Sequence, residues 1–287
     1  MNAILLCLAI VMGTVAESPI QSALKVTYIG NTGFLIETQD RKIAIDALFG
    51  GWTSDDYDIP PDSVVDLMRA AQPPFDNIDI VAVTHWHADH FSASIVAQHM
   101  QQDTGCVVLC PRQVADRLAA QPEYAEISER VHVIDIAIDS VAIYNQNGIS
   151  SKILSSHHGS YFEVDSTGKT VDLHRDTRNL EYLFKIGGHT VFHSGDAALN
   201  YRYRYQLIGL GKDSIDAAFV QWWPCNDLPS FREIIVREDI LPRRIFFTHM
   251  APGRRAKLAR EPSCNSHLGV ILATHSLESW IIPSAEK

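Results

Sequence analysis

The chain has 287 residues, and 46% of them are hydrophobic, which is enough to bury a large core in one domain. It carries 24 basic and 34 acidic side chains, a formal net charge of −10, and no long run of like charges. A phosphate backbone is held by a basic surface, so this balance argues against a nucleic-acid interface. We expect a small-molecule substrate and no nucleic acid as partners.

Residues 1–16 predict an export signal. They are apolar from Ala3 to Val15 and end in the small-x-small pattern Thr14-Val15-Ala16, although they contain no basic residue. The segment is short for a transmembrane helix. We therefore expect a periplasmic or secreted protein with one domain at residues 17–287 and no integral membrane span after cleavage. An uncleaved N-terminal anchor or a wrongly assigned start of the chain is the alternative.

Strand and helix patterns alternate along the first half of the mature chain. Three short strands separated by turns come first, and a loop rich in Gly, Asp and Pro follows at residues 48–62. The predicted strands lie at residues 24–30, 33–38, 41–47, 78–84, 106–110 and 130–136. The predicted helices lie at residues 64–71, 92–102 and 112–120. The three opening strands predict a meander at the edge of a sheet.

Strand patterns return in the second half of the chain. They lie at residues 140–145, 150–158, 180–187, 189–196, 216–220 and 244–249, and a helix is predicted before each of the last two. No internal repeat or linker divides the chain, so the alternation predicts an α/β domain in which each half forms one sheet.

Four cysteines follow the predicted signal: Cys106, Cys110, Cys225 and Cys264. They form no C-x-x-C pair, and four in a chain of this length do not make a disulfide scaffold. The apolar run around Cys106 and Cys110 favours buried thiols, although a single disulfide bridge stays open.

The stretch "AVTHWHADHF" at residues 82–91 predicts a metal site. It follows a buried strand, whose extended backbone lets His85 and His87 point to the same side and reach one ion. Asp89 and His90 then fall where the chain turns into the next helix, towards a neighbouring position. A solvated His-rich loop is the alternative, but this spacing rarely arises by chance.

This motif resembles the signature of the metallo-β-lactamase superfamily. Three further stretches resemble family motifs in the family order: "RKIAIDA" with Asp46, "HSGDAA" with Asp196, and "FFTHM" with His249. The resemblance runs from residue 24 to about residue 250. It implies an α/β fold, the four-layer αββα sandwich, with the metals at one edge of the two sheets.

The resemblance also implies two metal ions and their ligands. These are His85, His87 and His158 for the first ion and Asp89, His90 and His249 for the second, with Asp196 bridging both. Adjacent residues of a strand point to opposite faces, so only one of His157 and His158 can serve. Gly159 after His158 fits the family pattern, and His157 is the alternative. Asp46 would support the ligands.

Imidazoles and carboxylates without thiolates suit Zn²⁺, and Mn²⁺ or Fe²⁺ are alternatives. Two divalent ions that share a carboxylate also hold a hydroxide, because coordination lowers the pKa of water towards ~7. In the mechanism that the resemblance implies, this bridging hydroxide attacks a carbonyl or phosphoryl centre. Asp89 is the candidate that carries a proton to the leaving group.

The sequence differs from better-known subgroups of this superfamily, and the differences narrow the range of activities that we expect. Classical zinc β-lactamases of the family commonly carry Cys at the position of Asp196, glyoxalase-like members have a different turn at the third ligand, and nucleases usually bring a basic surface. Oxygen-reducing di-iron members would show Glu in place of His87. The chain is similar instead to lactonases of phosphorylated sugars and phospholipase-D-like hydrolases, which implies hydrolysis of an ester, a lactone or a phosphodiester. A non-catalytic metal-binding or accessory protein on the same fold is the alternative.

Three further stretches are candidates for lining the cleft. They are the loop 48–62 with Trp52, the alternating Tyr and Arg residues at 200–207, and the pair Trp222-Trp223. A surface helix and a packed aromatic corner are the alternatives for the last two. His189 and His193 match no ligand of the family and are interpreted as structural or as supporting the ligands.

Overall fold

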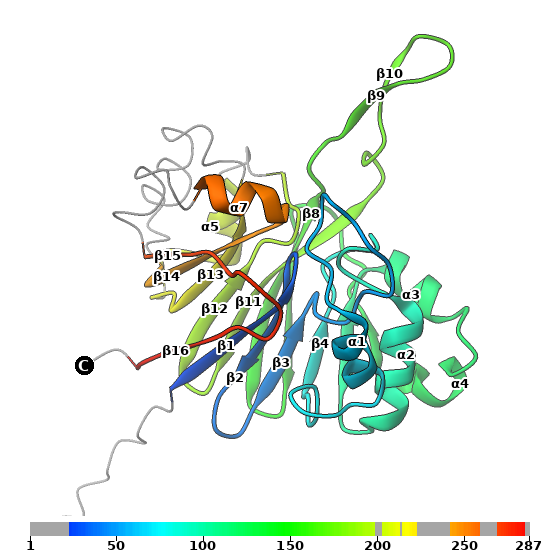
Figure 1. Ribbon diagram of the computed structural model, residues 1–287. Helices are drawn as coiled ribbons and strands as arrows, with labels where there is room; N and C mark the ends of the chain where they lie inside the picture. Colours follow the sequence, from blue (N-terminus) through cyan, green and yellow to red (C-terminus); the bar gives the residue numbers. More distant parts are fainter. Residues whose placement is uncertain (1–22, 199–202, 213, 223–241, 259–268, 285–287) are drawn as a thin grey trace, which may run out of the picture.

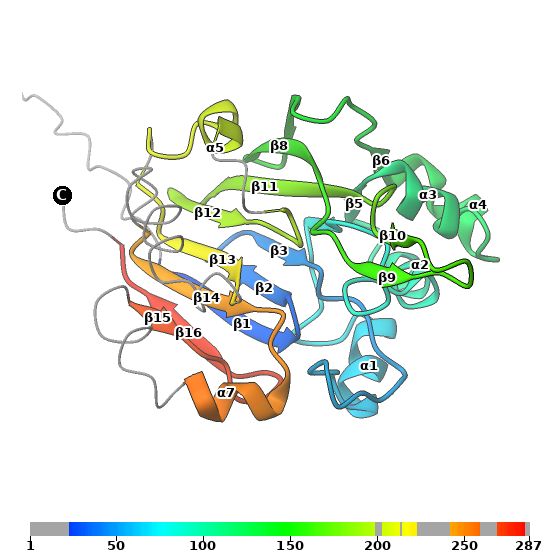
Figure 2. The ribbon, with the colours of Figure 1, turned by 90° about the horizontal axis from the view of Figure 1, so that it is seen from above.

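The described part of the protein is built on two seven-stranded β-sheets packed face to face, with helices on the outer sides (Figures 1 and 2). The computed structural model describes residues 23–198, 203–212, 214–222, 242–258 and 269–284. Three apolar clusters fill the spaces between helices and first sheet, between the two sheets, and outside the second sheet. The predicted αββα sandwich is therefore confirmed.

The first sheet has the strand order β16-β1-β2-β3-β4-β5-β6. Its strands are β1 (Leu24–Gly30), β2 (Gly33–Glu37), β3 (Lys42–Ile45), β4 (Ile80–Ala82), β5 (Val107–Cys110), β6 (Val131–Val133) and β16 (Ser279–Ile282). Side chains alternate between its faces: Phe34 and Ile36 point to the second sheet, and Leu35 points to the helices. Strands β3 to β6 are parallel, so their carboxyl ends lie at one edge.

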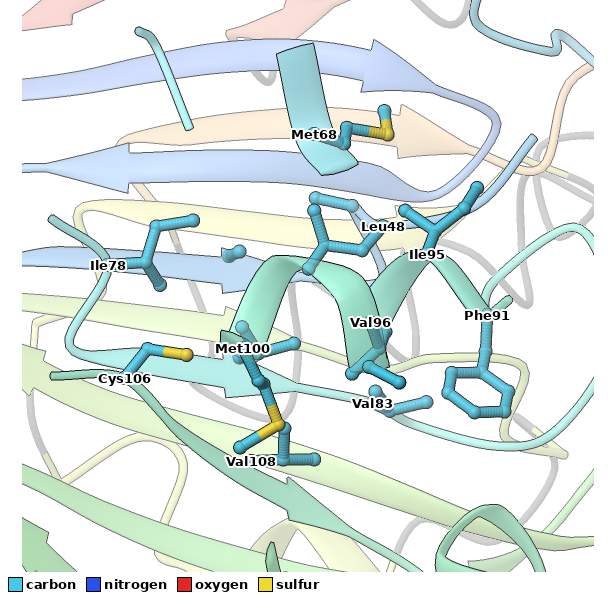
Figure 3. Packing of buried hydrophobic residues seen from close by; sticks show 14 of the residues in the cluster. Leu48, Met68, Ile78, Val83, Phe91, Ile95, Val96, Met100, Cys106 and Val108 are labelled. Carbon is cyan, nitrogen blue, oxygen red and sulfur yellow. The ribbon is translucent and has the colours of Figure 1, made fainter. Parts of the chain in front are cut away.

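Four helices cover the outer face of the first sheet. They are α1 (Asp62–Arg69), α2 (Ala93–Gln102), α3 (Arg112–Leu118) and α4 (Tyr124–Ile127), which continues into the 3₁₀ helix η1 (Ser128–Arg130). In α1, Val64, Val65 and Met68 are buried on one side, and Asp62 lies in the first turn, where an acidic residue favours the helix dipole. Figure 3 shows Met68 and Met100 in the core between these helices and the sheet.

The second sheet has the strand order β15-β14-β13-β12-β11-β8-β7. Its strands are β7 (Val141–Gln146), β8 (Ile149–His157), β11 (Arg178–Ile186), β12 (His189–His193), β13 (Ala217–Gln221), β14 (Arg244–Thr248) and β15 (Val270–Ile271). Strands β12 to β15 are parallel, and β8 runs in their direction because β8 and β12 are both antiparallel to β11. Helix α5 (Tyr203–Ile208) packs outside this sheet, and α7 (Pro252–Leu258) follows β14.

Aromatic side chains pack between the two sheets and connect them. The ring of Phe34 in the first sheet lies 4.4 Å from the ring of Phe219 in the second. The Tyr182 hydroxyl crosses the interface and donates to the carbonyl oxygens of Val83 and Leu109 at 2.9 and 3.0 Å. This packing holds the carboxyl ends of the two sets of parallel strands next to each other.

The structure corrects the predicted arrangement at three places. The last strand, β16, pairs with β1 of the first sheet, so the sheets do not divide the chain into halves and β1 is not at an edge. A two-stranded hairpin, β9 (Phe162–Val164) and β10 (Thr170–Asp172), projects from the body (Figure 1) where no strands were predicted. The short strand β15 was also not predicted, because two residues carry no periodicity.

Several sequence predictions lie outside the described residues. These include the export signal at residues 1–16, the helix before residue 244, and Cys225 and Cys264. Within the described part of the chain, no helix is long and apolar enough to cross a membrane. Cys106 and Cys110 are buried free thiols, as predicted, and burial raises the pKa of each to about 12.

Candidate metal centre

The predicted ligands come together at one edge of the two sheets. His85, His87, Asp89 and His90 follow β4 in the first sheet, and the other three residues follow β8, β12 and β14 in the second sheet. In the second sheet, β8, β12 and β14 run in the same direction, so the segments that follow them leave at one edge. The segment that follows β4 of the first sheet leaves at the same edge of the sandwich. Seven side chains that are scattered over the sequence therefore meet in space.

The first group consists of three imidazoles. Nε2 of His85 lies 3.0 Å from Nδ1 of His87, and the ring of His158 lies 4.6 and 4.8 Å from these two rings. One nitrogen from each of the three lies within 4.8 Å of the others. The structure brings His158 to this group, whereas His157, the alternative, is exposed.

The second group consists of Asp89, His90 and His249, and Asp196 connects it to the first. Oδ2 of Asp89 lies 3.4 Å from Nε2 of His90 and from Nε2 of His249. Oδ2 of Asp196 lies 3.0 Å from Nε2 of His249 and 3.5 Å from Nε2 of both His90 and His158. Asp196 therefore lies between the two groups, where a bridging carboxylate was expected.

Buried hydrogen bonds orient the imidazoles. Asp46 Oδ2 lies 2.8 Å from Nδ1 of His90 and accepts from the Thr84 hydroxyl at 2.7 Å, and Asp46 Oδ1 accepts from the Thr84 amide. Nδ1 of His158 donates to the carbonyl oxygen of Gly159 at 2.7 Å. With Nδ1 of His90 and His158 engaged in this way, Nε2 of both rings is left facing the centre, as in histidines that bind metals.

The turn between β1 and β2 supports the second group, a role that the sequence did not reveal. The Asn31 amide donates to Asp89 Oδ2 at 2.8 Å, and its backbone oxygen accepts from the amide of His249 at 3.3 Å. The Thr32 hydroxyl lies 3.0 Å from Nδ1 of His90. The "NTG" stretch had indicated only a turn.

Asn179 of β11 holds the loop that carries Asp196. Its Oδ1 accepts from the Asp196 amide at 3.0 Å, and its Nδ2 donates to the Ser194 carbonyl oxygen at 3.1 Å. Gly195 is necessary here, because it has a φ of +52° and a Cβ atom would lie 2.4 Å from Asn179 Oδ1. Nε2 of His193 donates to the Thr32 carbonyl oxygen at 2.9 Å, which agrees with its predicted structural role.

The two groups differ in charge. Burial, followed by the neighbouring histidines, holds the pKa of His85 well below its ordinary value and lowers that of His87 to about 3. Both imidazoles are therefore neutral at pH 7, and each has a lone pair for a cation.

Carboxylates dominate the second group. Burial opposes their charge, yet His90 and His249 hold the pKa values of Asp89 and Asp196 well below the ordinary range. Burial also opposes charge on His249, but Asp196 and Asp89 raise its pKa to about 9. The carboxylates thus attract positive charge, which protons supply in the metal-free protein and which a divalent cation would supply in their place.

The donor set fits divalent metal ions. Nε2 of His90, Nε2 of His158 and Oδ1 of Asp196 are buried, and none of them makes a hydrogen bond with a described residue. Buried polar atoms without partners are costly, and a cation at this edge would satisfy all three. Nitrogen and oxygen donors without sulfur are the ligands that suit zinc, manganese or iron.

Two further side chains border the centre and were not predicted. The Tyr57 ring, in the loop between β3 and α1, lies edge-on to the His249 ring at 5.3 Å. Burial, then Asp89 and Asp196, raise the pKa of Tyr57. His174, beyond the β9–β10 hairpin, lies 4.2 Å from the His158 ring and 4.7 Å from the His87 ring. Single residues in loops carry no periodic signal that would have marked them.

Only some of the residues that were predicted to line the cleft lie beside the centre. Trp52 packs against Tyr57 with a ring separation of 6.0 Å, so its loop does lie beside the centre. Arg204 and Tyr205 are instead buried under the second sheet, where Arg204 donates to Asp139. Trp222 contacts the Arg254 guanidinium. Residues 200–202 and Trp223 lie outside the described residues.

An αββα sandwich with histidines and aspartates at one edge defines a class of candidate metal-binding proteins. Within it, the chain belongs to the family described as the beta-lactamase superfamily domain, whose model matches residues 41–260. The chain is 27% identical over 176 residues to a UPF0173 metal-dependent hydrolase of Methanosarcina mazei, an alignment that covers 61% of this chain and 62% of that protein. Alignments with relatives of Methanosarcina barkeri and Carboxydothermus hydrogenoformans likewise span less than two thirds of those proteins, 62% and 64%.

Solved structures show the same fold. The metallo-beta-lactamase fold protein YhfI of Bacillus subtilis has 14% identity and a TM-score of 0.56, with 91% of this chain and 99% of that chain covered. The short form of human tRNase Z has 11% identity and a TM-score of 0.57, with 91% and 100% covered. At these identities the likeness concerns the fold alone.

Proposed function

We propose that the protein is a metal-dependent hydrolase that binds two divalent ions, zinc foremost, and cleaves an ester, lactone or phosphodiester bond of a small molecule. The observation that carries this proposal is Asp196, whose Oδ2 lies within 3.5 Å of histidines from both groups while its Oδ1 is buried without a hydrogen bond. A carboxylate in that position can hold two cations side by side.

The relatives support the hydrolase class. The Methanosarcina mazei protein is named a metal-dependent hydrolase, and its alignment with this chain covers 62% of its length. Asp196 stands where zinc β-lactamases commonly carry Cys, so we favour esters, lactones and phosphodiesters over β-lactams.

In this proposal each group of residues has its own task. Bound divalent ions would lower the pKa of a water molecule to about 7 and neutralise charge that develops on the substrate. His85, His87 and His158 would hold one ion, and Asp89, His90 and His249 would hold the other. Oδ2 of Asp89 is engaged by the Asn31 amide, so we propose that its other oxygen, Oδ1, carries a proton to the leaving group.

Metal analysis combined with a substrate screen tests the proposal. Zinc-loaded protein should contain two ions per chain and hydrolyse at least one of 4-nitrophenyl acetate, a γ-lactone and bis(4-nitrophenyl) phosphate. Asp196→Ala should lose turnover and keep the fold, whereas Asp135→Ala, an exposed aspartate paired with Arg112, should behave as the wild type. Turnover retained in Asp196→Ala, or fewer than two ions at saturation, would contradict the dinuclear site. Two bound ions without any turnover would favour a non-catalytic metal-binding protein.

A further inference from the structure

Tyr57 reaches the candidate centre from outside the set of ligands. Its ring lies edge-on to His249, with 5.3 Å between ring centroids and 79° between ring planes, and Trp52 packs against it at 6.0 Å. The side chain is neither buried nor fully exposed. It therefore lies beside a residue of the second group and is still partly open to solvent.

The Tyr57 ring lies beside the carboxylates of the second group. It contacts His249, whose Nε2 is 3.0 Å from Asp196 Oδ2 and 3.4 Å from Asp89 Oδ2. The Tyr57 hydroxyl makes no hydrogen bond within the described part of the chain, whereas that of Tyr28 donates to Asp58 at 2.7 Å. A phenol at a polar site without a partner is available to a ligand.

The chain on both sides of Tyr57 is held in place. The Tyr57 amide donates to the Ser54 hydroxyl at 3.2 Å, and the next residue, Asp58, is paired with Arg255 of α7. The loop also lies directly against the end of β1, since a Cβ atom on Gly30 would lie 2.6 Å from the Asp58 carbonyl oxygen. The position of Tyr57 is thus determined by the fold and not by a freely moving loop.

We propose that the Tyr57 hydroxyl donates a hydrogen bond to the substrate oxygen that gains negative charge when the bond is attacked. The inference rests on the proposed hydrolase function and adds a substrate contact to it. Hydrogen bonds to a charged acceptor are roughly twice as strong as neutral ones. Removing one donor of this kind from a closed site costs about 10²–10³-fold in rate. Since Tyr57 is partly open to solvent, we expect a loss of about 10- to 100-fold.

A purely structural role for Tyr57 makes a different prediction. If the ring only packs against His249, Tyr57→Phe keeps that contact and changes nothing. If the hydroxyl contacts the substrate, Tyr57→Phe loses activity while metal content and unfolding temperature stay those of the wild type. Tyr124→Phe is the matched control, because it removes a hydroxyl from α4, which packs on the outer face of the first sheet.

The experiment uses zinc-loaded full-length protein. We would measure kcat and KM with 4-nitrophenyl acetate and bis(4-nitrophenyl) phosphate, and the Kd of inorganic phosphate by calorimetry, since phosphate presents a similar array of charged oxygens. Tyr57→Phe should lower kcat/KM by about 10- to 100-fold and raise the phosphate Kd by about tenfold, with unchanged zinc content. Tyr124→Phe should match the wild type.

The two readouts separate this inference from the proposed function. If the wild type is active and Tyr57→Phe stays within twofold of it in both kcat/KM and phosphate affinity, the role of Tyr57 is wrong and the hydrolase function stands. If the wild type hydrolyses no probe, the hydrolase function is wrong. The phosphate Kd alone then tests whether the Tyr57 hydroxyl contacts a charged oxygen. A tenfold loss of affinity in Tyr57→Phe then supports the contact, and an unchanged affinity overturns it.

Discussion

Asn31 connects the first turn of the fold to the second group of candidate ligands. Its amide donates to Asp89 Oδ2 at 2.8 Å, and its backbone has a φ of 41°, a conformation that most residues avoid. Glycine adopts this conformation without strain, so Asn31→Gly removes the amide and leaves the turn intact. Residues that orient a ligand in this way typically contribute about 10- to 100-fold to metal affinity.

We therefore expect Asn31→Gly to weaken the binding of one zinc ion by about 10- to 100-fold and to leave the other unchanged. Competition with a chromophoric chelator would measure both affinities. Asn147→Gly is the control, since Asn147 also has a positive φ, of 50°, in a turn far from the centre. Equal zinc affinities in the two variants would show that the Asn31 amide does not position Asp89.

Glu181 is a buried carboxyl group away from the centre. It lies on β11 with 1% of its surface exposed, and neither carboxyl oxygen makes a hydrogen bond with a described residue. Burial raises its pKa to about 7, although the Arg204 guanidinium acts in the opposite direction. The folded protein therefore holds a proton that the unfolded chain releases near the ordinary carboxyl pKa of 4.5.

Between these two pKa values the unfolded state binds fewer protons at Glu181, so the contribution of Glu181 to the stability of the fold falls as pH rises and levels off above about pH 7. Glu181→Gln removes this contribution. We expect its free energy of unfolding, relative to the wild type, to rise by about 2 to 3 kcal/mol from pH 5 to pH 8. Urea unfolding of metal-free protein at both pH values measures the difference, and a difference that does not change with pH would mean that Glu181 titrates normally.

At the scale of elements, the β9–β10 hairpin projects from the body of the protein (Figure 1). Phe162 and Val164 are 64% and 69% exposed, and the two strands form a sheet of their own. The base of the hairpin is different, because the Gly159 amide donates to the Asp196 carbonyl oxygen at 2.7 Å and its own oxygen accepts from His174 Nδ1 at 3.0 Å. The projecting part and the base can thus be separated.

Replacing residues 163–171 with Asn-Gly should join Phe162 to Asp172 through a tight turn. Because the base is retained, we expect the same zinc content as the wild type and an unfolding temperature within about 3 °C of it. Metal analysis and calorimetry check both. A loss of zinc would show that the hairpin holds His174 and His158 in place.

At the scale of the whole molecule, the candidate centre joins the two sheets. Four of its residues follow β4 of the first sheet, and His158, Asp196 and His249 belong to the second. Bound ions would therefore cross-link the sheets at one edge, and any ion that binds only the folded chain stabilises it.

We expect metal-free protein to unfold at a lower temperature than zinc-loaded protein. The stabilisation reaches about 4 kcal/mol at a free ligand concentration 1,000 times the Kd. Calorimetry after chelation and after reloading measures the shift, which should be smaller in Asp196→Ala. Equal unfolding temperatures with and without zinc would contradict a centre that links the sheets.

The predictable part of the fold is the part with regular periodicity. The strand at Leu24–Gly30 was predicted with its exact bounds, and most other strands and helices differ by a few residues at their ends. The hairpin at 162–172 was missed because each of its strands has only three residues, which is too short a stretch for a periodic pattern to stand out. The pairing of β16 with β1 joins residues more than 250 positions apart, and no local pattern specifies it.

The sequence by itself determined an α/β domain and the histidine and aspartate cluster at residues 85–90, because strand and helix periodicity and the H-x-H-x-D-H spacing are local properties. The resemblance to the metallo-β-lactamase superfamily implied the αββα class and the three distant candidate donors His158, Asp196 and His249. Tertiary structure decided which of two adjacent histidines faces the centre, since that depends on the register of β8 against β11. It also placed Asn31, Asn179 and Tyr57 beside the candidate ligands, since these contacts form only where separate loops meet. A local pattern can predict which side chains follow a strand, but only the packing of the two sheets determines which other side chains they contact.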